Sequence, residues 1–321
     1  MAATLTLAPM GLLAQDAHLS QYDAGAVLLN PALTGMYEQS DFRIASNLRS
    51  QWSSLSSAFI TTAFAYDLNF QQRYGAGLYM CNYDQAGMMT TFEGGFTGSY
   101  NVSQKNAKHT LSVGVRAGLI YKKVNDADLL FDAQYNNGYF DQDLPSGEMF
   151  NKRGRLMPDL GLGFAYRSVH SMRMFNPFGN FAAYHITRPD ESIFRVGKTP
   201  MPIRWTAMGG VTVTINERFR FSPMGLFMQQ NKDREINAGV LGECAIGDGV
   251  YHALLGGSYR VGDAIIVQTG IKHKNSAFRM SYDVNISPLS TFTRNRGAFE
   301  FSIIYYGTHN GRERRTQRSS F

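Results

Sequence analysis

The segment FRMSYDVNIS, residues 278–287, alternates between apolar and polar side chains without a break. The apolar set consists of Phe278, Met280, Tyr282, Val284 and Ile286, and the polar set of Arg279, Ser281, Asp283, Asn285 and Ser287. Successive side chains of a β-strand point to opposite faces, so this segment predicts a strand with one apolar and one polar face.

The same alternation recurs along most of the chain. It is clear in LSVGVRAGLIY (111–121), DLGLGFAYR (159–167) and IRWTAMGGVTVTI (203–215). Residues 41–306 contain about fourteen such segments, many of them near the roughly ten residues that a tilted membrane-crossing strand requires. The predicted strand cores are 41–48, 57–68, 74–83, 90–101, 109–121, 159–167, 180–187, 203–215, 218–228, 237–246, 250–260, 263–273, 277–287 and 298–306.

Polar and apolar residues alternate in the strands of both a membrane barrel and a soluble β-sandwich. The lengths of the connections distinguish the two folds. Short turns follow even-numbered strands, at 216–218, 247–249 and 273–276. Long connections follow odd-numbered strands, at 122–158, 188–202, 229–236 and 288–297, while 261–263 and 168–179 depart from the rhythm. Short inner turns and long outer loops are typical of outer-membrane barrels. The sequence therefore predicts an all-β fold, a transmembrane antiparallel up-and-down β-barrel of about 14 strands over residues 41–306.

The N-terminal part of the chain does not alternate. Residues 5–14 form a short apolar run ending at Ala14, so residues 1–15 are predicted to be a signal-peptide remnant, with a frayed start of the mature chain as the alternative. Residues 16–40 contain Asn30 followed by Pro31, a pair that resists both helix and strand. The apolar content of residues 16–40 predicts that they line or plug the periplasmic mouth of the barrel, with a flexible leader as the alternative.

Charge and cysteine content narrow the function classes. The net charge is +6, but a basic tail at 307–321 supplies much of it, so no nucleic-acid partner is expected. Cys81 and Cys244 lack metal-type spacing and are expected to be ordinary strand residues. The predicted inward face carries charges of both signs, which need water or partners: Arg43, Arg49, Asp67, Glu93, Arg116, Asp159, Arg167, Arg204, Arg220, Glu243, Arg260, Arg279, Asp283 and Glu300.

Motifs for catalysis are missing from the sequence. The histidines are scattered, and neither HExxH nor GxSxG occurs. The glycines of YGAGLY (74–79) and GLGFAY (161–166) fall inside predicted strands, where they indicate close packing rather than a phosphate cradle. We therefore expect no enzyme activity, no catalytic or metal-binding residues and no cofactor, although a triad assembled from distant strands is an open alternative.

Several stretches together resemble the PorP/SprF family of type IX secretion system outer-membrane proteins. They are QDAHLSQYDAGAVLLNPALTG (15–35), NLRSQW (47–52), AYDLNF (65–70), MSYDVNISPLS (280–290) and GAFEFSIIYY (297–306). The residues that carry the motif are Ser20, Gln21, Tyr22, Asn30, Pro31, Ala32, Gly35, Arg49, Gln51, Trp52, Tyr282, Asp283, Asn285 and Ser287. The missing basic start of the signal and the long loop at 122–158 depart from the family pattern.

The resemblance implies a non-enzymatic barrel in the cell outer membrane, surrounded by its lipid. It implies partners in the type IX secretion machinery and a large secreted surface protein, in some members an adhesin used in gliding or attachment. Within the long outer loop, Tyr135, Tyr139 and Phe140 are candidate partner contacts, because exposed aromatic side chains anchor interfaces; a solvated loop without a partner is the alternative. A channel for small solutes or hydrophobic molecules and a soluble β-rich binding protein are the competing functions.

Overall fold

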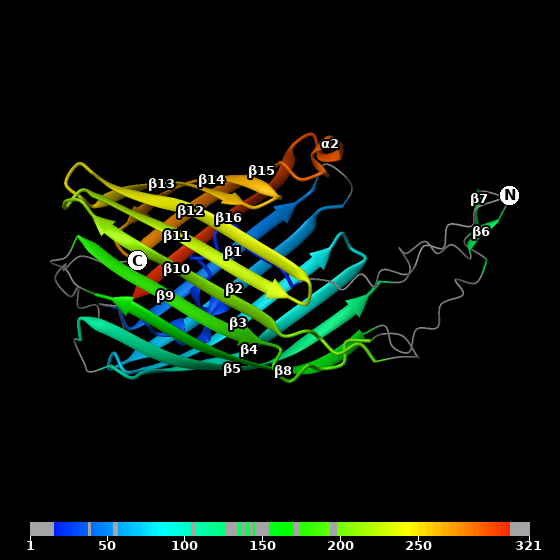
Figure 1. The fold of residues 1–321 in the computed structure, drawn as a ribbon, viewed down its shortest axis with the longest axis horizontal. Helices are drawn as coiled ribbons and strands as arrows, with labels where there is room; N and C mark the ends of the chain where they lie inside the picture. Colours follow the sequence, from blue (N-terminus) through cyan, green and yellow to red (C-terminus); the bar gives the residue numbers. More distant parts are fainter. Residues whose placement is uncertain are drawn as a thin grey trace.

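The computed structural model describes residues 16–37, 40–53, 57–103, 107–125, 134–136, 139–141, 144, 154–169, 174–192 and 198–308. Their dominant feature is one closed antiparallel barrel of fourteen strands, which confirms the predicted fold class. Figure 1 shows that the strands of the barrel wall are tilted relative to the barrel axis, as closure of a sheet requires. No helix among these residues has the length and hydropathy to cross a membrane.

Each barrel strand pairs with its neighbours in chain order, and β1 pairs with β16 to close the ring. A separate two-stranded hairpin, β6–β7, lies in the connection between β5 and β8. The barrel strands are β1 (Phe42–Gln51), β2 (Phe59–Phe70), β3 (Tyr74–Gln85), β4 (Met89–Asn101), β5 (His109–Val124), β8 (Gly154–Ser168), β9 (Phe175–Tyr184), β10 (Arg204–Thr214), β11 (Phe219–Gln230), β12 (Asp233–Ile246), β13 (Tyr251–Arg260), β14 (Ala264–His273), β15 (Ser276–Asn285) and β16 (Arg296–Gly307). The hairpin strands are β6 (Tyr135–Asn136) and β7 (Tyr139–Phe140).

The alternation in sequence becomes an inside and an outside. Along β15 the odd-numbered positions are buried, whereas Phe278, Met280 and Tyr282 are 40–46% exposed on the outer face. The charged residues predicted to face inward are all buried or half-buried. This arrangement, with apolar side chains outside and polar ones inside, is the one that a membrane-spanning barrel requires.

The barrel has two unlike ends. We call the end with connections 125–153, 185–203 and 286–295 the loop end; the last of these contains the short helix α2 (Ser290–Thr293). We call the opposite end, with connections 71–73, 247–250 and 274–275, the turn end. Three of the four connections predicted to be long lie at the loop end and are long, but the loop end also has short connections at 86–88, 231–232 and 261–263.

Several predicted boundaries were wrong, chiefly at the loop end. β5 continues to Val124 and β8 begins at Gly154, so the predicted loop 122–158 is shorter and contains the β6–β7 hairpin. The predicted long connection at 229–236 is a tight turn, because β11 and β12 extend to Gln230 and Asp233. Likewise β9 begins at Phe175, inside the predicted connection 168–179. At the ends of β5, β11 and β12 polar residues occupy both faces, which hides the alternation, whereas at the starts of β8 and β9 apolar residues occupy both faces.

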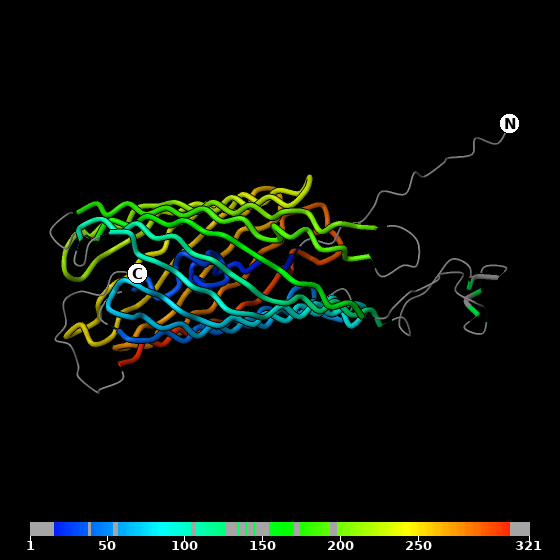
Figure 2. Tube along the Cα trace, turned by 90° about the horizontal axis from the view of Figure 1, so that it is seen from below, coloured from blue at the N-terminus to red at the C-terminus, as the bar shows by residue number. Residues whose placement is uncertain are grey.

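Residues 16–37 lie inside the barrel (Figure 2, blue). They form the short helix α1 (Ala26–Leu29) and the 3₁₀ turn η1 (Pro31–Leu33), joined by Asn30. Near the loop end, the backbone N–H of Asp16 donates to Gln230 at the end of β11 (3.1 Å). Near the turn end, the side chain of Asn69 donates to the carbonyl of Gly35 (2.7 Å). The segment therefore crosses the lumen from one end to the other before β1 begins.

Candidate functional site in the barrel lumen

Ser20 lies where charged side chains from three strands converge. Its hydroxyl donates to Asp283 of β15, with both carboxylate oxygens at 2.8 Å. Two guanidinium groups donate to the same hydroxyl, that of Arg49 on β1 and that of Arg260 on β13, the latter at 2.7 Å. All four side chains are buried. A single serine hydroxyl thus bridges two cations and an anion, all of them buried.

Gln21 completes this contact through its backbone and its carboxamide. The carboxylate of Glu300 accepts hydrogen bonds from the backbone N–H groups of Ser20 (2.7 Å) and Gln21 (3.2 Å). The carboxamide of Gln21 donates to Ser281 (3.2 Å) and accepts from Ser302 (2.6 Å). Both backbone N–H groups and the whole carboxamide of this dipeptide thus form hydrogen bonds with side chains of the barrel wall.

The charges around Ser20 also bind one another. Arg49 forms ion pairs with Asp283 (3.0 Å) and Glu300 (3.5 Å), and Arg260 pairs with Asp283 (3.2 Å) and Asp263 (2.9 Å). Removing charges from water costs several kcal/mol per ion, and good hydrogen-bond geometry offsets that cost. We name the buried set Arg49, Arg260, Ser281, Asp283, Glu300 and Ser302 the Ser20 pocket.

Asn30 holds the middle of the segment against the opposite wall. Its side-chain amide donates to the carbonyls of Phe164 (3.1 Å) and Phe181 (2.9 Å), on β8 and β9. Its side-chain oxygen accepts from the backbone N–H of Ala32 (2.8 Å), which caps η1 with Pro31 at its first position. The Asn-Pro pair therefore begins a 3₁₀ turn rather than a loop, and the asparagine binds the wall.

Glycines in the wall make room for this turn. A Cβ atom at Gly163 would overlap the Asn30 side chain, and one at Gly114 would overlap the backbone of Pro31 and Ala32. Gly75 likewise faces the carbonyl of Thr34 with no room for a side chain. The close-packing role predicted for the glycines of YGAGLY and GLGFAY is confirmed at Gly75 and Gly163.

Near the turn end, Gly35 adopts φ +65° and touches the backbone of Leu68, so a side chain there would be strained and crowded. Its N–H donates to Asp67 (2.6 Å), which also pairs with Arg43 (2.9 Å). These contacts fix the chain just before it enters β1.

Apolar side chains of the segment pack on several parts of the wall: Val27 lies against β2 and β3, and Tyr22 and Leu29 lie against β10 and β11. Tyr22 and Leu29 form a buried cluster with Leu226. Met208, Met224 and Met228 pack around this cluster. Methionine is flexible and fills irregular space, which suits the packing around Tyr22 and Leu29.

At the loop end, Asp16 completes a second charged cluster. His185 lies between two carboxylates, with Nε2 2.6 Å from Asp16 and Nδ1 2.9 Å from Asp159, and Arg204 lies 3.0 Å from Asp16. Burial lowers the pKa of His185, but the charge of Asp16 and hydrogen bonds to both carboxylates outweigh burial and raise it overall. Burial raises the pKa of Asp16, but His185 and Arg204 hold it well below its usual range. Sequence reasoning missed this cluster, because no local pattern links these distant residues.

The other motif residues lie apart from the Ser20 pocket, except Gln51, which accepts a hydrogen bond from Arg49 (3.4 Å). Asn285 accepts from the N–H (2.9 Å) and hydroxyl (2.7 Å) of Ser287 and so shapes the 286–295 loop. Trp52 packs edge-on against Phe59 near the loop end, with ring centroids 5.2 Å apart. Tyr282 is 44% exposed on the outer face of β15 and does not reach the lumen.

The candidate partner contacts fall in the hairpin. Tyr135 pairs with Phe140 through the backbone, and the side chain of Tyr139 is 80% exposed. The long connection therefore carries at least one projecting aromatic side chain at the loop end.

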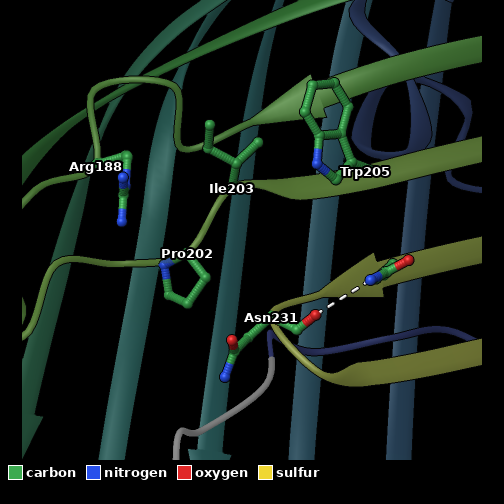
Figure 3. Close-up of a pocket in the computed structure, with 6 residues that line it drawn as sticks. Arg188, Pro202, Ile203, Trp205 and Asn231 are labelled. Carbon is green, nitrogen blue, oxygen red and sulfur yellow. Dashed lines mark hydrogen bonds between the residues drawn. The ribbon is translucent and has the colours of Figure 1, made fainter.

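A shallow hollow of about 260 Å³ lies at the loop end beside β10 and β11. Figure 3 shows Arg188, Pro202, Ile203, Trp205 and Asn231 around it, with the carbonyl of Asn231 accepting from Gln229 (3.2 Å). These lining residues supply one cation and no carboxylate, histidine or thiol. Across the described ranges, no three His, Cys, Asp or Glu side chains are placed to hold a metal ion.

Comparison with known proteins shows which family the sequence belongs to. The family model for the type IX secretion system membrane protein PorP/SprF matches residues 12–305. No curated protein matches the sequence. The solved structures that it resembles include the CymD monoaromatic hydrocarbon channel, with TM-score 0.52 and 10% identity over 89% of this chain and 93% of that one. Another is the toluene transporter TbuX of Ralstonia pickettii, with TM-score 0.52 and 13% identity over 89% and 94%. At such identities these likenesses show the barrel fold alone.

Proposed function

Because the chain belongs to the PorP/SprF family of type IX secretion system membrane proteins, we propose that it is an accessory barrel of that system in the outer membrane. In this proposal it assists the export or the surface anchoring of a large secreted protein of the adhesin type. It does so without enzyme activity and without a cofactor.

The occupied lumen is the observation that carries this proposal beyond family membership. Four polar residues of the lumen segment are at most 2% exposed, which means that segment and wall pack together without open space around them: Ser20, Gln21, Asn30 and Thr34. A channel for small solutes or hydrophobic molecules, the competing function, would need the space that residues 16–37 fill. A partner would therefore contact the loops at the outer rim, including the β6–β7 hairpin, rather than pass through the barrel.

A pull-down of the tagged protein from native outer membranes in mild detergent tests this function. We expect one large secreted protein or components of the secretion machinery to be recovered and identified by mass spectrometry. Removing the hairpin, residues 134–141, should reduce that recovery while the barrel still assembles. A folded barrel recovered with no companion protein would overturn the proposal and favour a channel.

A further inference from the structure

The hollow beside β10 and β11 lies where the apolar outer face of the barrel meets the loop end. Trp205 lines it together with Arg188 and Asn231 (Figure 3). The indole ring is 43% exposed and stacks on the ring of Phe181 on β9, with centroids 5.6 Å apart. Tryptophan side chains of membrane proteins gather at the level of the lipid headgroups. The hollow therefore lies at the depth where a headgroup passes into its acyl chains.

Three cations surround the hollow. Arg188 lines it, Lys232 lies in the tight turn between β11 and β12, and Arg234 follows at the start of β12. All three are exposed, and none of them forms an ion pair with another residue that the structure describes. Asp233, between the last two, occupies an inward-facing position of β12, and the acidic residues of the 185–203 connection pair with cations of β5 and β8. The outer side of this rim is therefore positively charged.

A phosphate group suits this setting. Arginine and lysine form charge-assisted hydrogen bonds with phosphate oxygens, and the arginine fork can form two at once. Gln229 and Asn231 add side-chain amides to the lining, and none of the lining residues is acidic. The hollow thus offers several donors and no competing carboxylate.

Below the hollow, the outer face of the wall forms a trough centred on β10. Ala207 pairs with Phe181 of β9 on one side and with Phe227 of β11 on the other. Neighbouring strands lie about 4.8 Å apart, so the two phenyl groups stand about 10 Å apart across Ala207. Both phenyl groups are exposed on the outer face, at 48% and 36%. They form the sides of a trough that has room for one acyl chain.

The glycines that continue this trough are not required by packing within the protein. Gly209 pairs with Gly179 on β9 and with Gly225 on β11. A Cβ atom at any of the three would lie 3.5–3.8 Å from its nearest neighbour, an ordinary contact, whereas at Gly163 it would overlap Asn30. Glycine weakens a strand and often marks the close approach of a ligand. The small size of these residues therefore fits an occupant outside the wall.

We propose that the hollow and the trough together bind one phosphorylated, acylated amphiphile of the surrounding membrane. Its phosphate lies in the hollow against Arg188 and Arg234, and one acyl chain lies along Ala207 and Gly209. Basic pockets at the membrane surface bind anionic lipid headgroups by the same chemistry. This inference requires a membrane-embedded barrel but no secreted partner, so its test and the pull-down can fail independently.

Fluorescence of Trp205 measures the binding, in the full chain with Trp52→Phe, which leaves one tryptophan. The folded protein in neutral detergent micelles is titrated with phosphatidic acid whose acyl chains carry bromine, a contact quencher of tryptophan. Phosphatidylcholine with the same chains is the comparison, because its choline neutralises the phosphate. We expect half-maximal quenching at a several-fold lower mole fraction of phosphatidic acid. Inorganic phosphate at the same concentration should not relieve the quenching; relief would assign the hollow to free phosphate and overturn the proposal.

Two variants with matched controls test the two parts of the site. Arg188→Gln combined with Arg234→Gln should remove the preference for phosphatidic acid, whereas Arg218→Gln, an exposed cation at the turn end of the same wall, should keep it. Gly209→Leu fills the trough and should raise the mole fraction needed for either amphiphile several-fold. Gly257→Leu on β13, where the nearest atom to a Cβ is also distant at 3.7 Å, should not.

Equal quenching by the two amphiphiles in the parent protein would overturn the proposal. Unchanged quenching in the double arginine variant or in Gly209→Leu would do the same.

Discussion

The hydroxyl of Ser20 lies 2.8 Å from both carboxylate oxygens of Asp283, a residue 263 positions away on β15. This contact joins a segment that precedes the barrel to one of its last strands. It also places two parts of the motif, SQY and SYDVN, against each other. Two separate parts of the family motif therefore contact each other in the folded protein.

Replacing the Ser20 hydroxyl should destabilise the protein. Ser20→Ala removes the hydrogen bond to Asp283 and those from the two arginines, and hydrogen bonds to charged groups contribute about 1.5–3 kcal/mol. We expect a loss of that size in the free energy of unfolding, measured by urea titration in detergent micelles. Ser46→Ala, on the outward face of β1, is the matched control and should change little. Equal effects of the two substitutions would contradict the contact.

Gly114 tests the notch that receives the Asn30 turn. Gly114→Ala places a methyl group against the backbone of Pro31 and Ala32, whereas at Gly98 on the neighbouring strand the nearest atoms are 3.9 Å away. Overpacking of this kind costs about 1–3 kcal/mol. Limited proteolysis should therefore cut residues 16–37 sooner in Gly114→Ala than in Gly98→Ala. The same cutting rate in both variants would show that the turn is not seated in the notch.

Replacing Asn237 on β12 should stabilise the protein or leave its stability unchanged. Its side chain is fully buried, and neither its amide nitrogen nor its oxygen has a hydrogen-bond partner in the described part of the chain. Such a group carries a desolvation cost of about 1–3 kcal/mol. Asn237→Leu, of similar size, should hold or raise the thermal unfolding midpoint. A clear decrease would mean that the amide is satisfied in the membrane.

The Asp16–His185 contact should weaken at high pH. A raised folded pKa means that protonated His185 contributes its full stabilisation below its ordinary value of 6.5 and loses it as the pH rises through the folded value. The lowered pKa of Asp16 means that its contribution is present above 3.8 and is lost only at lower pH. His185 faces Asp16, Asp159 and Arg204.

We therefore expect a spin label at Ala17→Cys, in the background without the native cysteines, to become more mobile as the pH rises from about 6 to 9. His185→Gln should remove that change. A mobility that is independent of pH in the parent protein would contradict the ion pair.

Alternation along the strands was enough to predict the barrel, its strand number and its inward charges, because the membrane and the lumen impose opposite polarity on neighbouring residues. It failed at the rims, as at Lys122 and Gln230, where both faces of a strand are polar. The motif included Ser20, Gln21, Asn30, Gly35, Arg49 and Asp283, but only the path of residues 16–37 through the lumen shows that Ser20 meets Arg49 and Asp283. Asp16 and His185 carried no signal at all, since their contact depends on where the segment crosses the lumen.

Conductance in planar lipid bilayers is the most direct test of the occupied lumen. The full-length barrel should show no sustained open-channel current, because residues 16–37 fill its interior. The variant combining Glu300→Gln with Gly114→Ala, which loosens both halves of the segment, should conduct. A steady ohmic current through the unaltered protein, unchanged in that variant, would contradict the account and make the barrel a channel.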